Sequence, residues 1–525
     1  MSIKLDPEYL DPISINWTID HISKYGDTDI FPIPFEFEAY KFLRNDIVDY
    51  LSKINISEFE FNSFIKFMVP KHGKGYRAAV QLDPLDCIIY DSLIYEICNN
   101  IENYRVKKEL KIACSYRISP TPTGEIFQKD NGWEDFKLKS NELSLDSNCN
   151  FVLLTDISDF YNQISHHRIQ GSISSSNVTE NKSKVIERLL NNLNSSQHSR
   201  GIPVGPIGSV PLSEACLNDV DLYLIRNGIK HTRYVDDFRI FCNSHEQAVK
   251  AIHDLTEYLH IAHRLSIQDS KTIIKSKYEF RNKDLYDPEL DESFEKQNKI
   301  SEFIDSLDLP SFISEEDIDI GDEQDAAFTR EVIHDLFEEM LTKENVNFGL
   351  ARYLLRRASA LRSRIILQQA LDNLEILIPV LREVINYIIN VYDKKSPKQV
   401  GNKLIKFIRN SEYKSIPVIQ YWTLDALIRN KDFCDLDEIS DIINNSNKEI
   451  SERMMALAAK QYNLVDWVKS RKENWKNASE WAQRAIIWSS SILPKDERNH
   501  WLSHVEKASS INTSLIAKAT RIKYN

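Results

Sequence analysis

The chain has 525 residues, 42% of them hydrophobic and 10% aromatic, and a formal net charge of −12. This composition is sufficient for two to four domains with sizeable cores, and it excludes a disordered protein. No run approaches the roughly 18 apolar residues of a membrane span, no signal-peptide pattern opens the chain, and the seven cysteines form no C-x-x-C pair, so we expect a reducing, cytoplasmic setting with no membrane partner.

Up to residue 283 the sequence mixes short apolar runs with helical segments, which predicts an α+β body. The stretch "LDCIIYDSLIYEICNNIENY" at 85–104 is typical of a buried helix. The run "FVLLTD" predicts a buried strand that ends at Asp156. The polar, Ser- and Asn-rich segment 171–184 predicts a loop.

A Gly- and Pro-rich stretch, "RGIPVGPIGSVP", follows at 200–211. Gly201, Gly205 and Gly208 suit either an ordinary turn or a loop whose backbone closely approaches a ligand. The position of this stretch between two aspartate-bearing elements favours the ligand-binding interpretation. The residues after it, up to 225, predict a helix.

The stretch "HTRYVDDFRIFC" at 231–242 predicts a β-hairpin with two adjacent aspartates at its turn, Asp236 and Asp237. Carboxylates that crowd together repel unless water or a cation separates them, so the turn is either a solvated hairpin tip or a divalent-metal site. A third carboxylate, Asp156, is available at the end of the strand predicted before it. Three such carboxylates are the set that two-metal phosphoryl transfer requires, and Asp236 has the firmer metal role.

Residues 284–325 hold 16 Asp or Glu against two Lys, a net charge of −14, so the rest of the chain carries +2. This segment predicts a solvated acidic connector between two domains, 1–283 and 326–525. The alternative is a nucleic-acid mimic that shields a basic cleft.

After residue 326 strand signals disappear, and apolar residues recur at helical spacing. Segments such as "IPVLREVINYIINVY", "ISERMMALAAKQY" and "ASEWAQRAIIWSSSIL" are loosely related and lie a few tens of residues apart. They predict an all-α region, either a HEAT-like helical repeat or a bundle. Five arginines on one of its segments form either a phosphate-binding track or a solvated helix face: Arg352, Arg356, Arg357, Arg362 and Arg364.

The ordered motifs resemble those of the reverse transcriptases. "DISDFY" is similar to their motif A, "GIPVGPIGSVPLSE" to motif B, "YVDD" to motif C and "HRLSIQDSKTIIKSK" to motif D. "VPKHGKGYRAAVQLDPLDCIIYDSL" is similar to their fingers motifs. The resemblance covers about residues 65–280 and implies a fingers–palm fold.

The resemblance also implies roles for individual residues. Asp156, Asp236 and Asp237 match the catalytic, metal-binding carboxylates, and Ile157 joins them in the metal site. Tyr161 matches the aromatic gate that rejects a ribose 2′-hydroxyl, which implies dNTPs as substrates. The expected nucleotide-binding residues are Lys71, Lys74, Arg77, Tyr161, Gly205 and Lys271. The implied cofactors are two Mg²⁺ ions, with Mn²⁺ as a substitute.

Two positions depart from the family pattern. Val204 stands where motif B usually has Gln, which puts conventional template-directed copying in doubt. Glu214 stands where many members have Asn. The retroviral RNase H and the endonuclease module of mobile introns are also missing from the pattern.

A polymerase core with a long helical region most resembles the abortive-infection and defence-associated reverse transcriptases of bacteria. That implies a homo-oligomer that synthesises DNA against phage, with or without a non-coding RNA template, and primed by a protein hydroxyl. Tyr524, next to last in the chain, is a candidate priming residue if the tail is mobile. The alternatives are a scaffold with a retired palm, and a retron-like or intron-like enzyme that copies a linked RNA.

Overall fold

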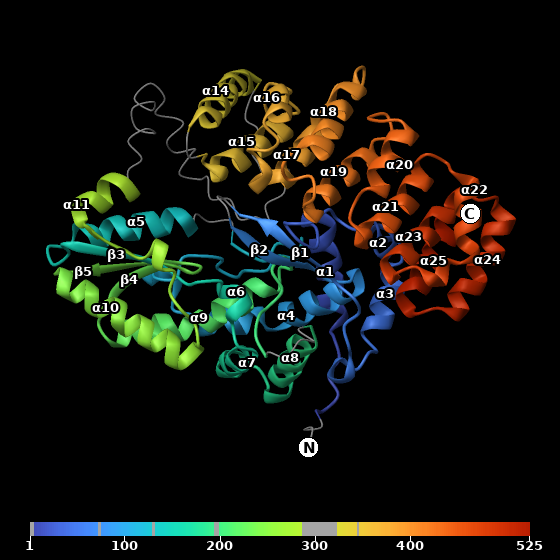
Figure 1. The fold of residues 1–525 in the computed structure, drawn as a ribbon. Coiled ribbons are helices and arrows are strands. Elements are labelled where there is room, and N and C mark those ends of the chain that lie inside the picture. The colour runs from blue at the N-terminus through green and yellow to red at the C-terminus, as the bar shows by residue number, and fades with distance from the viewer. Residues whose placement is uncertain (1–4, 72–74, 129–131, 194–198, 286–322, 344–345) are drawn as a thin grey trace. The chain divides into compact units, whose positions relative to one another are not determined.

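The computed structural model describes residues 5–71, 75–128, 132–193, 199–285, 323–343 and 346–525 (Figure 1). The chain folds into two compact units, each built from separate stretches of sequence. Unit 1 comprises Met1–His21, Val48–Asn62 and Asp86–Pro310, and unit 2 comprises Ile22–Ile47, Ser63–Leu85 and Ser311–Asn525. The predicted acidic connector, 284–325, lies almost entirely outside the described residues.

Unit 1 is organised around a four-stranded antiparallel sheet with the order β4-β5-β3-β6. The predicted strand is confirmed as β3 (Phe151–Asp156), and the predicted hairpin is confirmed as β4 (Lys230–Tyr234) and β5 (Asp237–Cys242). The fourth strand is β6 (Ile273–Ser276). Central strand β3 is buried because both of its neighbours and the helices around it cover its apolar residues.

Helices pack on the sheet of unit 1, with α5 drawn above it and α9 and α10 below it in Figure 1. Side chains alternate between the faces of β5: Arg239 reaches the ring of Phe136 on α5, 4.1 Å from its centroid, whereas Phe238 and Ile240 are buried. The α-helices described up to residue 285 are α1 (Pro12–Tyr25), α2 (Glu36–Phe42), α3 (Arg44–Leu51), α4 (Pro84–Tyr104), α5 (Gly132–Leu145), α6 (Phe160–Gln163), α7 (His166–Ser175), α8 (Glu180–Leu193), α9 (Ser209–Arg226), α10 (His245–Tyr258) and α11 (Lys277–Phe280).

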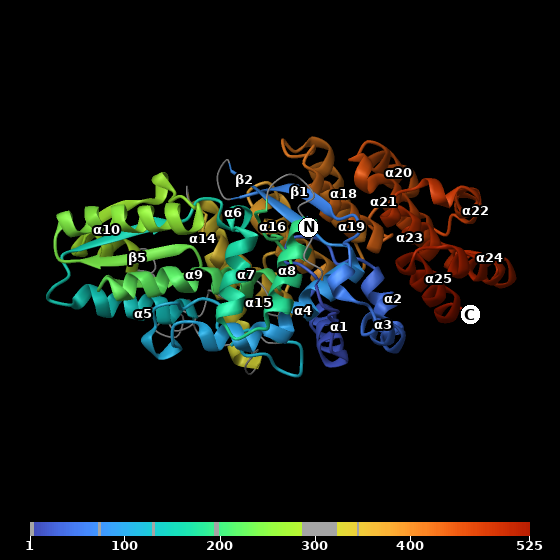
Figure 2. The same cartoon turned by 90° about the horizontal axis from the view of Figure 1, so that it is seen from below.

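The prediction of a loop at 171–184 is wrong. Helices α7 and α8 occupy most of this segment and lie side by side (Figure 2). The many serines and asparagines led to the prediction of a loop. The helices form because apolar side chains at helical spacing, such as Ile169 and Ile173 on α7, are buried. Packing of these two helices outweighs the local preference of Ser and Asn for turns.

Unit 2 contains an antiparallel hairpin of β1 (Ile65–Pro70) and β2 (Tyr76–Gln81), and β1 contacts helix α19. The α-helices that lie wholly in it are α2 and then α14 (Glu323–Thr342), α15 (Phe348–Ala360), α16 (Leu367–Asp372), α17 (Leu381–Val391), α18 (Pro397–Asn410), α19 (Pro417–Arg429), α20 (Leu436–Asn444), α21 (Lys448–Gln461), α22 (Val465–Glu473), α23 (Glu480–Ser489), α24 (Lys495–Ala508) and α25 (Ile511–Lys523). No helix in the described ranges is long and apolar enough to cross a membrane.

The C-terminal region is helical, as the sequence predicted, and of the two predicted arrangements its helices form a repeat rather than a bundle. Helices α15, α17, α19, α21, α23 and α25 each contact the next one in this series, and α18, α20, α22 and α24 pack beside them (Figure 1). The six helices begin at residues 348, 381, 417, 448, 480 and 511, a spacing of roughly 31 to 36 residues. The repeat is irregular because the connections between helices differ in length.

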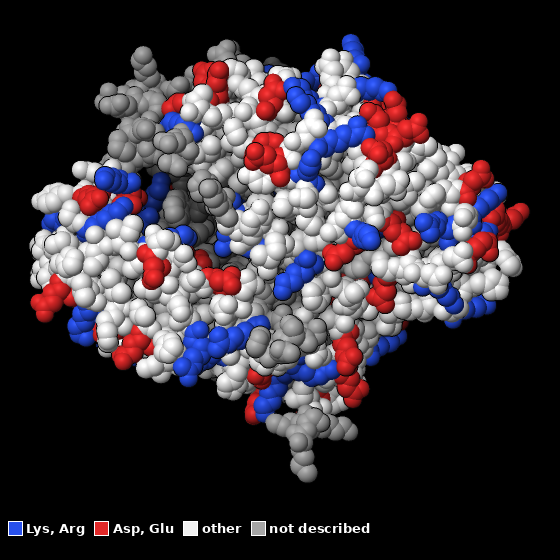
Figure 3. All heavy atoms as spheres, viewed as in Figure 1, with Lys and Arg blue, Asp and Glu red and all other residues white. Residues whose placement is uncertain are grey.

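Charged side chains of both signs are interspersed on the C-terminal helices in the face that Figure 3 shows. Ion pairs join successive outer helices: Arg409 on α18 meets Asp441 on α20 at 2.8 Å, and Lys398 lies 2.9 Å from Asp435. The predicted arginine track is not one exposed surface. Arg356 and Arg357 are buried, and Arg356 donates to Glu383 at 2.7 Å.

A buried ion cluster joins α2 to the C-terminal helices of unit 2. The fully buried Glu36 accepts two hydrogen bonds from Arg453, both at 2.7 Å, and one from Arg484 at 2.9 Å. Arg484 also lies 2.8 Å from the buried Asp83 at the end of the β1–β2 hairpin. Burial would raise the pKa of the Glu36 carboxyl, but Arg453 and Arg484 hold it below its usual value.

The substitution Glu36→Gln is therefore expected to lower the free energy of unfolding by about 3 kcal/mol, because it leaves two buried guanidinium groups short of their carboxylate. Chemical denaturation at pH 7 measures this effect. The control is Glu38→Gln two residues away, where an exposed carboxylate pairs with Lys523 on the surface, and its expected loss is below about 1 kcal/mol. Equal losses for the two variants would contradict the stabilising role of the cluster.

Candidate active site

Two of the predicted catalytic residues face each other across neighbouring strands of unit 1. Asp156 at the end of β3 is the register partner of Asp237 at the start of β5. Asp236 occupies the turn just before β5, and its carbonyl accepts the N–H of Ile157 at 3.3 Å. The sheet therefore brings together the elements that carry all three carboxylates and Ile157.

The three carboxylates differ in exposure and in electrostatic environment. Asp156 is buried, Asp236 is half-buried and Asp237 is exposed. Burial, together with the charges of Asp156 and Asp237, raises the pKa of Asp236 to about 7. Lys271 donates to the Asp156 carboxylate at 2.7 Å and so partly neutralises the group.

The turn between β4 and β5 contains a strained residue. Val235 has a φ of +52°, a left-handed conformation that a β-branched side chain rarely adopts and that costs about 1–3 kcal/mol. Two hydrogen bonds hold it: its N–H donates to the Ser115 hydroxyl at 2.9 Å, and its carbonyl accepts from Arg233 at 2.8 Å. The position of Asp236, the next residue, depends on these two bonds.

A buried ion network supports both hydrogen bonds. Glu214 on α9 is fully buried and accepts from Arg105 at 2.6 Å, from Ser115 at 2.6 Å and from Arg233 at 3.1 Å. Arg233 also donates to the buried Asp221 at 2.6 Å. Glu214, which departs from the motif B pattern, is thus the shared acceptor of the groups that hold the turn.

The predicted gate residue Tyr161 lies on α6 and is half-buried. Its hydroxyl accepts a hydrogen bond from Ser213 at 3.1 Å, and burial raises its pKa well above the usual value. The Gly/Pro loop is fastened to the same helix, because the N–H of Ile202 donates to the Tyr161 carbonyl at 2.9 Å. Gly205 in that loop has a φ of +138°, which side chains disfavour, so glycine is needed there.

Of the remaining predicted site residues, Lys71 and Arg77 lie on the β1–β2 hairpin of unit 2, and Lys74 is outside the described residues. Tyr524 is not in a mobile tail. Its carbonyl accepts from Arg498 at 2.6 Å, its hydroxyl accepts from Lys460 at 2.9 Å, and its ring packs edge-on against Trp488. The condition on which its priming role was predicted is therefore not met in this structure.

The donor set of unit 1 fits divalent metal ions in chemistry. Three carboxylates from β3 and the β4–β5 turn concentrate negative charge, and oxygen ligands of this kind suit Mg²⁺. The ammonium group of Lys271 contacts the Asp156 carboxylate, which shows that a cation is favourable at this position. Within the described part of the chain, no three His, Cys, Asp or Glu side chains are already arranged around one point as ligands.

Sequence reasoning did not identify Arg105, Ser115 and Arg233 as residues that support the site. Arg233 offered a signal, because an arginine two residues before the turn on a buried strand requires a carboxylate partner. Arg105 and Ser115 gave no such signal, since each is distant in sequence from Glu214 and lies in no motif.

Part of the chain matches a known protein family. The family model described as reverse transcriptase (RNA-dependent DNA polymerase) matches residues 69–298, which include the end of β1, the whole of β2 and all three carboxylates. No curated protein sequence matches the chain significantly.

Solved telomerase structures from two yeasts are similar to the chain at low identity. A truncated apo telomerase from Candida tropicalis is 13% identical over 41% of this chain and 50% of its own, with a TM-score of 0.32, so this chain spans half of its length. Apo telomerase from Candida tropicalis is 11% identical over 73% of this chain and 74% of its own, with a TM-score of 0.33. Candida albicans telomerase in complex with a telomeric RNA fragment is 10% identical over 78% and 70%, with a TM-score of 0.31.

The substitution Ser115→Ala is expected to loosen the turn that carries Asp236, because the Val235 N–H loses its acceptor. We expect amide hydrogen exchange at residues 235–237 to accelerate about tenfold, which corresponds to about 1.4 kcal/mol. Ser144→Ala on α5 is the matched control, since that buried hydroxyl donates only to Asn141 within its own helix. Unchanged exchange at the turn in Ser115→Ala would contradict the role of Ser115.

Proposed function

We propose that this protein, which carries a reverse transcriptase domain over residues 69–298, is a DNA polymerase that extends DNA from dNTPs and serves bacterial defence against phage. The observation that carries the polymerase proposal is the convergence of Asp156, Asp236 and Asp237 through the register of β3 and β5. The defence role is supported by the resemblance of the motifs and of the long helical region to abortive-infection and defence-associated enzymes.

In this proposal each residue of the site has a defined task. Asp156, Asp236, Asp237 and Ile157 would hold two Mg²⁺ ions, which when bound activate a 3′-hydroxyl and neutralise charge on the phosphates. Lys271 would leave its ion pair with Asp156 and bind the pyrophosphate leaving group instead. Lys71, Lys74 and Arg77 would bind the triphosphate through charge-assisted hydrogen bonds.

The question of template and primer has two proposed answers. A valine, Val204, at the usual glutamine position of motif B supports synthesis that is untemplated or uses a bound non-coding RNA in an unconventional way. Priming by a protein hydroxyl remains part of the proposal, but Tyr524 would have to leave its contacts with Lys460 and Trp488 to act as the primer. A homo-oligomer acting in the cytoplasm belongs to the same proposal.

The substitution Asp236→Asn is expected to abolish dNTP incorporation, by at least about a hundredfold, and to remove protection against phage. It should not lower the melting temperature, because it keeps the shape of the side chain and removes one of three crowded negative charges. Incorporation of labelled dNTPs, phage plating and thermal unfolding measure the three effects. Retained protection without incorporation would instead favour a scaffold with a retired palm.

The substitution Tyr161→Ala is expected to admit ribonucleotides, because the ring that would collide with the 2′-hydroxyl is gone. The ratio of dNTP to rNTP incorporation should fall by about tenfold or more. Tyr161→Phe is the matched control: it loses the hydrogen bond from Ser213 but keeps the ring, so it should keep the selectivity. If both variants discriminate like the unsubstituted protein, Tyr161 is not the gate.

A further inference from the structure

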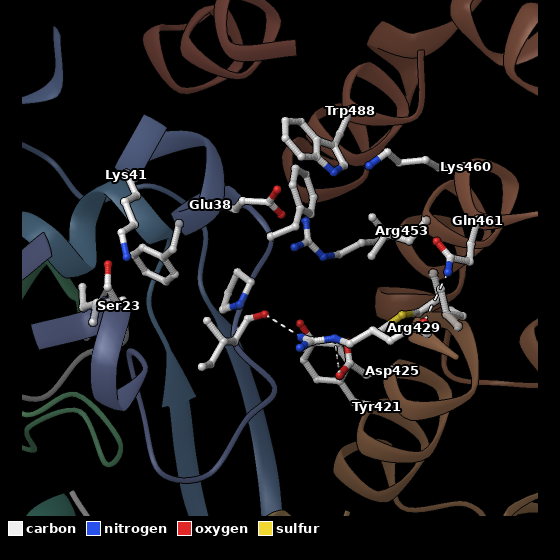
Figure 4. A pocket seen from close by; sticks show the side chains of 18 residues that line it. Ser23, Glu38, Lys41, Tyr421, Asp425, Arg429, Arg453, Lys460, Gln461 and Trp488 are labelled. Carbon is white, nitrogen blue, oxygen red and sulfur yellow. Dashed lines mark hydrogen bonds and ion pairs between the residues drawn. The ribbon is translucent and has the colours of Figure 1, made fainter. Parts of the chain in front are cut away.

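Unit 2 contains a pocket of about 500 Å³, which is within the size range of small-molecule sites (Figure 4). Its walls come from the end of α1, from α2 with the segment before it, and from helices α19, α21 and α23. None of its lining residues belongs to the candidate active site. Figure 4 shows Ser23 and Lys41 at one end, Lys460, Gln461 and Trp488 at the other, and Glu38 between them.

Two lysines in the pocket carry charge that no carboxylate neutralises. Among the described residues, no Asp or Glu oxygen lies within 4.0 Å of the ammonium group of Lys41 or Lys460. Lys460 is half-buried, donates to the Tyr524 hydroxyl and lies 4.7 Å from the ring centroid of Trp488. Burial lowers the pKa of Lys460, and the charge of Glu38 offsets this only in part.

The other charged groups of the pocket are already paired. Arg429 donates to Asp425 at 3.0 Å, and Glu38 is paired with Lys523. Both terminal nitrogens of Arg453 donate to Glu36, whereas its buried Nε has no acceptor within the described structure. The unneutralised charge of the pocket is therefore positive, and an anionic group would bind favourably there.

The pocket also offers surfaces for a planar, partly apolar body. Phe35 and Trp488 stack with ring centroids 5.3 Å apart, and Ile33 on the same wall is 40% exposed. Ser23 and Gln461 supply a hydroxyl and an amide beside these apolar groups. Gln461 already donates to the Arg429 carbonyl at 3.2 Å. A nucleobase with its sugar presents both apolar and polar surface, so it matches this lining better than a purely aliphatic anion does.

We propose that this pocket binds a mononucleotide, with the phosphate held by Lys41 or Lys460 and the base against the apolar wall near Phe35. The pocket is lined by residues of unit 2 alone, whereas the carboxylates belong to unit 1, so the inference does not rest on the polymerase proposal. A bound nucleotide would contact α2, α19 and α21 at once. It would therefore stabilise unit 2.

Binding is tested on the full chain by equilibrium dialysis with AMP, GMP, CMP and UMP in EDTA, which removes the metal ions that a palm site needs. We expect saturable binding of at least one nucleotide, and about tenfold weaker binding for Lys41→Met or Lys460→Met. Lys403→Met is the matched control, because that lysine pairs with Asp372 on the surface of unit 2 away from the pocket. Asp236→Asn should bind like the unsubstituted protein, which separates this site from the palm.

Three results would overturn the inference. The first is no saturable binding of any of the four nucleotides up to about 5 mM. The second is binding that both lysine variants retain in full. The third is binding of inorganic phosphate or of a nucleoside as tight as that of the nucleotide, since the site requires both parts. Lys41 is exposed, so its variant is expected to fold even if substitution of Lys460 disturbs the packing on Trp488.

Discussion

The arrangement of the candidate active site depends on one buried contact, that between Glu214 and Arg233. Both side chains are fully buried, so each charge needs the other. Arg233 then holds the carbonyl of Val235, and Ser115, fixed by Glu214, holds its N–H. A turn that would otherwise relax is kept in a left-handed conformation, and the carboxylates beside it are kept in register with Asp156. The stability of the palm and the geometry of its site therefore depend on the same ion pair, Glu214 with Arg233.

The sequence predicted the strand, the loop and the hairpin that carry the candidate site well because their signals are local. An apolar run ending in Asp156, a glycine-rich loop and a hairpin turn each follow from a few neighbouring residues, and the family resemblance supplied their order. Antiparallel pairing then places Asp156 opposite Asp237 without further information. The helical region was also predictable, since apolar residues at helical spacing recur through it. The failure at 171–184 has the same origin, because there the local preference of Ser and Asn opposed the packing of α7 and α8.

What the sequence could not predict are contacts between distant residues. Glu36 contacts Arg453 and Arg484, which are more than 400 positions away in the sequence. The residues around each of the three give no sequence signal of this contact. The same holds for the pocket, whose walls combine residues around Lys41 with residues around Lys460. The position of Tyr524 belongs to this class too: a terminal tyrosine suggested a free end, whereas Arg498 and Lys460 secure it. Such contacts follow from how helices stack, which a local pattern does not encode.

The serial stacking of α15, α17, α19, α21, α23 and α25 bears on how this half of the molecule comes apart. In an array where each member touches chiefly its neighbours, denaturation can spread inward from one end instead of happening all at once. The contacts of α2 with α25 and of β1 with α19 stabilise these two helices against such unfolding. Denaturation of this region is thus better described by a gradient of local opening energies than by one global transition.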